Sequence, residues 1–152
     1  MAVTMADVVR LLSPDEPDLH RAAAALGPDA LAHLEALLDG DDLMMAAKAT
    51  YVAGLIPDPR GVQVVRRAAT KSQRMVRMAA ATIAQRMPAD RAGDIIITLL
   101  RDEDPETRKM AVEAVQPASA SAVHAALAQV AKDDPHPYLR KLSEEKQGRS
   151  KS

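Results

Sequence analysis

Residues 99–115, LLRDEDPETRKMAVEAV, contain the pattern that decides the fold: the end of one helix, an acidic turn and the start of another helix. Asp104 stands where a helix N-cap is expected, and Pro105 follows at the first helical position, where proline is tolerated. The acids from Asp102 to Asp104 would meet the positive end of the second helix dipole. The stretch therefore predicts two helices joined by a short turn.

The same pattern recurs along the chain at a constant interval, the one that separates Leu34 from Val65. Four columns of positions with this spacing are apolar throughout: Leu34, Val65, Ile96 and Leu127; Leu37, Ala68, Leu99 and Val130; Ala49, Ala80, Ala111 and Leu142; and Val52, Ile83 and Ala114. Helix-breaking segments recur with nearly the same period, at residues 27–28, 57–59, 88–90 and 117–119. The apolar spacing within each unit is helical, and self-similarity of this length is typical of stacked helical repeats.

Each unit is long enough for two helices. We expect helices at residues 4–12, 15–26, 28–39, 42–55, 59–70, 73–87, 90–101, 105–116, 119–131 and 136–147. A helix pair of this size cannot cover its own apolar side, and stacking buries that side against the neighbouring pairs. The sequence thus predicts an all-α protein, a right-handed α-solenoid of about five antiparallel helix pairs. This single domain would span residues 1–147 and precede a disordered polar tail at 148–152.

The composition agrees with this fold class and narrows the setting of the protein. Phe and Trp are absent, and 47% of the residues are nonetheless apolar; the abundant Ala, Leu and Met are good helix formers. The absence of Cys excludes disulfides, thiolate metal sites and a cysteine nucleophile. No apolar run has the length of a membrane span or of a signal peptide. We therefore expect a soluble, cytoplasmic protein.

Residues 99–115 resemble the HEAT repeat, in the short bacterial form known from phycobilisome-lyase-like proteins. The resemblance continues in VRMAAATIA (76–84) and, in part, in HRAAAALG (20–27). It implies a helical solenoid whose second helices line the concave face. HEAT arrays mostly serve as protein-binding scaffolds, so the resemblance is more informative about fold than about function.

The resemblance also implies a ladder of ion pairs between adjacent units, made by an acid in each turn and a cation at a fixed spacing on the second helix. Three pairs of residues have this spacing: Asp15 and Arg21, Asp102 and Arg108, and Asp134 and Arg140. The second unit has Gly40 and Ala46 at these positions, and the third has Lys71 and Arg77. We therefore expect the ladder to be absent from the second unit and repulsive in the third.

Positive charge is concentrated in the third unit. Residues 59–92 contain eight cations and one acid, whereas residues 1–58 contain three cations and ten acids. The cations of the central basic stretch are Arg66, Arg67, Lys71, Arg74 and Arg77. One interpretation is internal pairing with acids such as Asp39, Asp41 and Asp42, which stabilises a protein by only ~0–1 kcal/mol for each exposed pair. The other is a patch that binds an anionic group, with Lys71, Arg74 and Arg77 on or beside the concave face.

The residue types that carry chemistry show no catalytic pattern. The four histidines stand neither in HEXXH nor at positions i and i+4 of a helix, so a structural role is favoured over a metal site. Phosphate-binding loops and the GxSxG nucleophile motif are also missing. We therefore expect no catalytic residue, no metal and no cofactor, in a protein that is not an enzyme.

Two functions from different classes remain. The leading hypothesis is a non-catalytic module that holds an acidic or partly apolar segment of another protein along its second helices, where several methionines could form an adaptable surface. The alternative, implied by the resemblance, is a phycobilin-lyase-like accessory protein that acts on a tetrapyrrole or on a modified partner protein. Nucleic acid is disfavoured as a partner by the absence of Trp and the pI of about 6.4. The sequence leaves the identity of the partner and the oligomeric state open.

Overall fold

The computed structural model describes residues 2–151, and the side chains of residues 2–148. Within that part of the chain, the regular structure consists of ten α-helices and one 3₁₀ turn, without a strand. The helices are α1 (Met5–Leu12), α2 (Leu19–Leu26), α3 (Leu31–Leu37), α4 (Leu43–Leu55), α5 (Pro59–Ala68), α6 (Arg74–Ala84), α7 (Ala89–Leu100), α8 (Pro105–Ala114), α9 (Ser121–Asp133) and α10 (Pro137–Lys151). The 3₁₀ turn, Pro28–Ala30, leads directly into α3.

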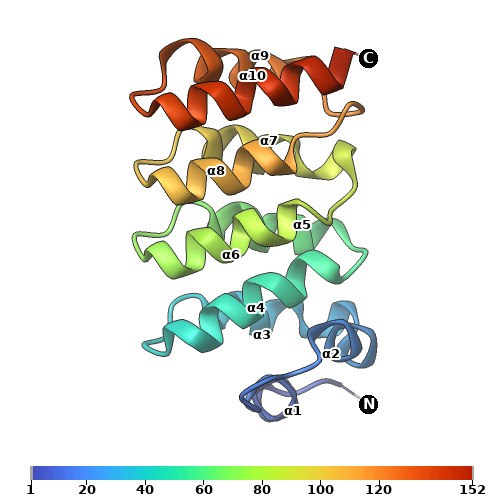
Figure 1. Ribbon diagram of the computed structural model, residues 1–152. Helices are drawn as coiled ribbons and strands as arrows, with labels where there is room; N and C mark the ends of the chain where they lie inside the picture. The colour runs from blue at the N-terminus through green and yellow to red at the C-terminus, as the bar shows by residue number, and fades with distance from the viewer. Residues whose placement is uncertain (1, 152) are drawn as a thin grey trace.

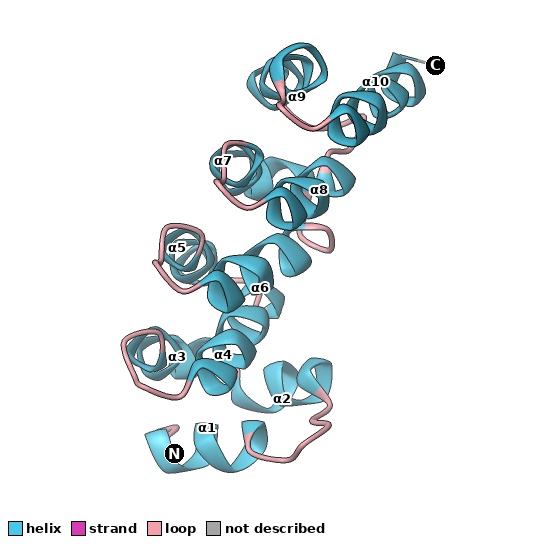
Figure 2. Cartoon of the chain, turned by 60° about the vertical axis from the view of Figure 1, so that its left-hand side comes forward, coloured by secondary structure: helices cyan, strands magenta, loops and turns pink. Residues whose placement is uncertain are grey.

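The helices are stacked as antiparallel pairs in two layers (Figure 1). The first helices of the pairs, α3, α5, α7 and α9, pack on one another, and so do the second helices, α4, α6, α8 and α10. Figure 2, in which the first helices are seen nearly end-on, shows the two layers side by side along the stack. At the N-terminal end, α1 and α2 lie across the direction of the helices above them (Figures 1 and 2). The predicted all-α solenoid is confirmed.

The apolar columns of the sequence form the core of this stack. All four members of the first column are buried: Leu34, Val65, Ile96 and Leu127. The alanine column is 0% exposed at Ala49, Ala80 and Ala111, on three successive second helices. Small side chains at these positions allow the backbones of α4, α6 and α8 to approach closely, which is why a core without Phe or Trp can be dense.

The alanine column departs from its interval in the last unit. Leu142, which the interval places after Ala111, is only partly buried, whereas Ser143 is 0% exposed. The core of α9 still keeps the interval, because Ile96 and Leu127 occupy equivalent positions. One extra residue therefore separates α10 from α9, and it shifts every core position of α10 by one. The assignment of Leu142 to this column is corrected to Ser143.

The helix predicted at 15–26 is shorter in the structure. It begins at Leu19, because the carboxylate of Asp18 accepts a hydrogen bond from the backbone N–H of Arg21 at 3.0 Å and caps the helix there. Pro17 also disfavours the helical conformation for the residue before it. Residues 15–17 therefore belong to the loop that joins α1 to α2.

At the other end of the chain, α10 continues to Lys151 instead of ending at 147. The predicted disorder of residues 148–152 stays a prediction, because the side chains from 149 onward and the whole of Ser152 lie outside the described residues. None of the helices described here is long and apolar enough to cross a membrane.

Replacing Ala80 or Ala111 by leucine is expected to lower the free energy of unfolding by about 2 kcal/mol, because the added carbons overpack a filled core. Urea denaturation followed by circular dichroism measures the change. Ala79→Leu is the matched control, since its position is adjacent on α6 and only partly buried. Unchanged urea midpoints for both core variants would contradict the packing described above.

Candidate functional site

The basic stretch of the third unit is paired with acids of neighbouring units. Arg67 and Lys71 share one carboxylate: Nη2 of Arg67 lies 2.7 Å from Oδ2 of Asp39, and Nζ of Lys71 lies 3.0 Å from Oδ1. Arg74 pairs with Asp104 at 3.1 Å. Asp39 belongs to the preceding unit and Asp104 to the following unit. Acids of both neighbouring units therefore compensate the cations on and beside α5 and α6.

Arg77 is buried, with only 9% of its side chain exposed, and it links its unit to the next one. Its Nε donates to Asp102 Oδ2 at 2.8 Å and its Nη2 to Oδ1 at 3.3 Å. Its Nη1 donates to the backbone carbonyls of Lys71 and Ser72 at 3.1 and 2.8 Å. The guanidinium therefore donates hydrogen bonds to carbonyls of the turn before its own helix and to the carboxylate of the following turn at the same time.

Arg108 repeats this arrangement one unit later. It donates to Asp134 at 2.8 and 3.1 Å, and to the carbonyls of Asp102 and Glu103 at 2.9 and 3.2 Å. The ladder thus runs from the cation of one unit to the acid of the next. The pairing of Asp102 with Arg108 inside one unit is only through the Asp102 carbonyl.

The expectation of a repulsive rung at Lys71 and Arg77 was wrong for this reason. Arg77 does not face Lys71 across a rung, because its carboxylate partner is Asp102, 25 residues later. Lys71 occupies the place of an acid whose cation would be residue 46, and residue 46 is alanine. No like-charge conflict arises, and Lys71 turns to Asp39 instead.

The two ends of the ladder differ from its middle. Arg140 keeps the backbone contact, donating to the carbonyl of Asp134 at 2.6 Å, and makes no ion pair among the residues described. Asp15 and Arg21 likewise form no ion pair within residues 2–148. Lys48 supplies the link to the first unit, because its Nζ donates to the carbonyls of Leu12 and Pro14 at 2.9 and 3.0 Å.

All five cations of the basic stretch are therefore paired with acids of the same chain, since Arg66 also has a partner, Asp94, at 3.4 Å. An open anion patch made of Lys71, Arg74 and Arg77 is not what the structure presents. Arg77 is the clearest correction, because a side chain that is 9% exposed cannot line a free surface. The excess positive charge of the third unit balances acids that the second and fourth units contribute.

The pairing of Asp39 has a testable consequence for the pH dependence of stability. Hydrogen bonds from Arg67 and Lys71 lower the pKa of Asp39 from 3.8 to about 2. Because the folded-state pKa is depressed, the ionised carboxylate stabilises the fold above about pH 4, and this stabilisation is lost as the pH falls through 2. A carbon-13 NMR titration of the carboxyl group measures the midpoint.

Arg67→Met is expected to raise the pKa of Asp39 toward 3.8, because it removes the largest cause of the shift. Arg101→Met is the control, since Arg101 is exposed at the end of α7 and has no contact with Asp39. An unchanged titration midpoint in the Arg67→Met protein would show that this pair does not form in solution.

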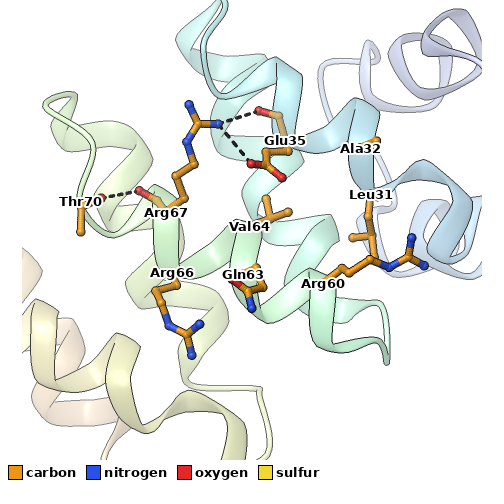
Figure 3. Close-up of a pocket in the computed structure, with 9 residues that line it drawn as sticks. All are labelled: Leu31, Ala32, Glu35, Arg60, Gln63, Val64, Arg66, Arg67 and Thr70. Atoms are coloured by element: carbon orange, nitrogen blue, oxygen red, sulfur yellow. Dashed lines mark hydrogen bonds and ion pairs between the residues drawn. The ribbon is translucent and has the colours of Figure 1, made fainter.

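A groove of about 600 Å³ lies between α3 and α5 (Figure 3). Its apolar surface comes from Leu31, Ala32 and Val64, and arginines stand around it. In Figure 3, Arg60 and Arg66 lie at separate ends with Val64 between them. Arg67 points toward Glu35, which also lines the groove.

These arginines are not equally engaged. Arg60 donates twice to Asp58, each time at 3.1 Å, and thereby lowers the pKa of that carboxyl. The pair of Arg66 with Asp94 is long, and the two side chains are 43% and 76% exposed. An exposed pair of this kind is worth only ~0–1 kcal/mol. Arg66 is therefore the groove arginine that a ligand could engage most easily.

A second groove, of about 270 Å³, lies on the other side of α5 and shares Gln63 and Arg66 with the first. Arg91 also lines it and makes no ion pair within residues 2–148. Arg60 and Gln63 were not among the candidate site residues predicted from the sequence. Their regular spacing from Arg66 was a signal that they share one side of a helix. The identity of the helix that faces this side could not be read from the spacing.

The described residues contain no cluster of three or more histidine, aspartate or glutamate side chains that could hold a metal ion. Two of the histidines have backbone partners: Nε2 of His33 lies 3.0 Å from the carbonyl of Val3, and Nε2 of His124 lies 3.3 Å from that of Pro117. These rings therefore join segments of the chain.

Comparison with known proteins finds similarity to solved structures alone. No protein-family profile and no curated protein matches the chain. Among solved structures, the chain is similar to one from the complex of CpcE and CpcF of phycocyanin lyase from Nostoc sp. PCC7120. The TM-score is 0.69 at 20% sequence identity, and the match covers 94% of this chain and 97% of that one. At this identity the likeness shows the fold, a solenoid of helical repeats.

The comparison corrects one expectation. We expected a protein that is not an enzyme, because the sequence lacks a catalytic motif. The same arrangement of helices is found in a subunit of a lyase, so the absence of a motif is no ground for that conclusion. The helical repeat solenoid is the part of the resemblance that the comparison supports.

Proposed function

We propose that the chain is a phycobilin-lyase-like subunit, built of short HEAT-like repeats, that acts on a tetrapyrrole together with a partner protein. The observation that supports this most is the likeness of almost the whole chain to one chain of the phycocyanin lyase complex. A match of this extent includes the helix pairs that form both grooves beside α5. The proposal replaces the non-catalytic scaffold as the leading hypothesis.

The proposed activity requires a second protein. The chain contains no cysteine, so a tetrapyrrole held by a thioether bond would be attached to a cysteine of the partner. The similar lyase structure is a complex of two proteins, CpcE and CpcF, which supports a protein partner here. The chain's own part would then be to bind and orient the tetrapyrrole or the modified partner.

The groove between α3 and α5 is the proposed site for the tetrapyrrole. A linear tetrapyrrole has a long conjugated body and two propionate groups. Arg60 and Arg66, at separate ends of the groove, would bind the carboxylates through charge-assisted hydrogen bonds, while Leu31 and Val64 contact the body. The described residues that line the groove include no aromatic side chain. Binding should therefore depend on charge more than on stacking, and should weaken as salt is added.

A visible-absorbance titration with biliverdin tests this proposal. The intact protein is expected to give a saturable change of the tetrapyrrole spectrum. Arg66→Glu should weaken binding by about tenfold or more, because it reverses a charge beside a propionate. Arg101→Glu is the matched control, since Arg101 is an exposed arginine that lies outside the groove.

A spectrum that does not change in a saturable way would contradict the proposed function. An equal loss of affinity in Arg66→Glu and Arg101→Glu would also contradict the assignment to this groove, because it would reduce the effect to overall charge. Circular dichroism of each variant establishes that the helical fold is retained.

A further inference from the structure

The exposed side of the second helices changes character along the stack. On α4 and α6 most of it is uncharged, and we call this surface the methionine face: the exposed Met44 and Met75 with the partly buried Ala47, Tyr51, Met78 and Ala79. Arg74, at the start of α6, is 55% exposed, and its guanidinium pairs with Asp104 of the next unit. Lys48 stands among these residues, but its ammonium group is turned to the carbonyls of Leu12 and Pro14. α4 and α6 pack directly against each other (Figures 1 and 2), so the two parts of the face belong to neighbouring helices.

On α8 and α10 charged residues predominate on the same side, with Tyr138 also exposed there. The equivalent positions include Glu106, Lys109, Glu113, Lys141 and Glu145. This half of the surface looks like an ordinary solvated helix face. The uncharged half on α4 and α6 is therefore not a general feature of the repeat.

The two outermost methionines of this face are not needed by the core. Met44 and Met75 are 56% and 44% exposed and occupy equivalent positions on neighbouring helices. By contrast, Met45 and Met110 pack against the core and fill it. Core filling in the absence of Phe thus explains the second pair of methionines and leaves the first pair unexplained.

Opposite charges without ion-pair partners stand at the two ends of the face. Asp41 lies beside the start of α4 and makes no ion pair within residues 2–148. Arg86 follows the end of α6 and also has no ion pair in that part of the chain. α4 and α6 run in the same direction (Figure 1). Asp41 precedes the start of α4 and Arg86 follows the end of α6, so the two charges belong to opposite ends of this helix pair.

We infer that the methionine face docks one amphipathic helix of the partner protein, with a cation of that helix near Asp41 and an acid near Arg86. Methionine suits this role because its unbranched, polarizable side chain adapts to the shape of an apolar stripe. An apolar stripe at i, i+3, i+4 and i+7 is the usual way in which a helix occupies such a surface. The inference deepens the proposed function, since it names the chemistry by which the partner is held.

A synthetic amphipathic peptide tests the inference. The probe is a fluorescein-labelled helix of about five turns, with leucine at every third or fourth position, lysine at one end and glutamate at the other. Fluorescence anisotropy should show saturable binding to the intact protein. A peptide of identical composition, scrambled so that the leucines share no face, should not bind.

Met75→Glu is expected to weaken peptide binding by about tenfold or more, because it places a charge against the apolar stripe. Tyr138→Glu is the matched control, because Tyr138 is the equivalent exposed residue on α10, 59% exposed and outside the methionine face. It should change affinity by less than about twofold. Arg86→Glu should in turn prefer a peptide with lysine at both ends.

Three results would overturn the inference: no saturable binding of the amphipathic peptide, equal binding of the scrambled peptide, or an equal loss of affinity in Met75→Glu and Tyr138→Glu. None of them alters the biliverdin titration, which depends on the groove between α3 and α5. Failure of the docking surface can therefore be told apart from failure of the proposed function.

Discussion

Replacing Arg108 by methionine is expected to lower the free energy of unfolding by about 3–5 kcal/mol, the range found when one partner of a buried ion pair is removed. The side chains of Arg108 and Asp134 are only 9% and 3% exposed. Without Arg108, the carboxylate of Asp134 loses both of its guanidinium contacts, and the carbonyls of Asp102 and Glu103 lose a donor. Methionine keeps most of the volume, so the loss reports the polar contacts.

Arg140→Met is the matched control for this prediction. Arg140 occupies the equivalent position on α10, but it donates only to the carbonyl of Asp134 and has no carboxylate partner among the described residues. Its removal should cost about 1 kcal/mol, the usual contribution of one hydrogen bond. Urea denaturation of both variants measures the difference. Equal losses would show that the link to the following unit contributes nothing to stability.

The stack of helices could be predicted from the sequence because burial leaves a simple trace. Positions that face the interior in every unit of the solenoid are mostly apolar, and their constant interval along the chain reveals them. The column of Leu34, Val65, Ile96 and Leu127 is buried in each unit. The same reasoning failed at Leu142, since an insertion of one residue before α10 is invisible when both Leu142 and its neighbours are acceptable in a helix.

The polar contacts could not be predicted in the same way. The spacing of Asp102 and Arg108 suggested a pair within or between units, and it did not indicate which acid the guanidinium would reach. In the structure that acid comes 25 or 26 residues later, because the following turn lies beside the helix. The charge of Lys71, Arg74 and Arg77 was visible, whereas their compensation depends on how adjacent units are placed.

The groove beside α5 could not be predicted from the sequence either. Its lining combines residues from two helices, such as Leu31 and Val64, that are apolar for ordinary reasons. The exposed arginines around it differ from other exposed arginines only in having apolar residues, such as Leu31 and Val64, between them. Position on a repeat predicts the core, but a groove depends on where neighbouring surfaces fail to meet.

The second large effect is expected at Gly61, where Gly61→Ala should lower the free energy of unfolding by about 3 kcal/mol, at the upper end of the range for overpacking. Gly61 is buried at the start of α5. A Cβ atom there would collide with the backbone carbonyl oxygen of Ala53 and lie 3.2 Å from that of Ile56. Backbone atoms cannot rotate aside as a side chain can, so α4 and α5 would have to separate.

Gly93→Ala provides the control, because the same substitution in α7 meets no such obstacle. A Cβ at Gly93 would have Val123 Cγ2 as its nearest neighbour, at 3.6 Å, an ordinary van der Waals contact. Alanine is the better helix former, so this variant should gain about 0.5–1 kcal/mol. Two identical substitutions in adjacent units should thus shift the urea midpoint in opposite directions. If Gly61→Ala also raised the midpoint, the close approach of α5 to the carbonyls at the end of α4 could not exist in solution, and the packing of the unit that bears the groove would have to be revised.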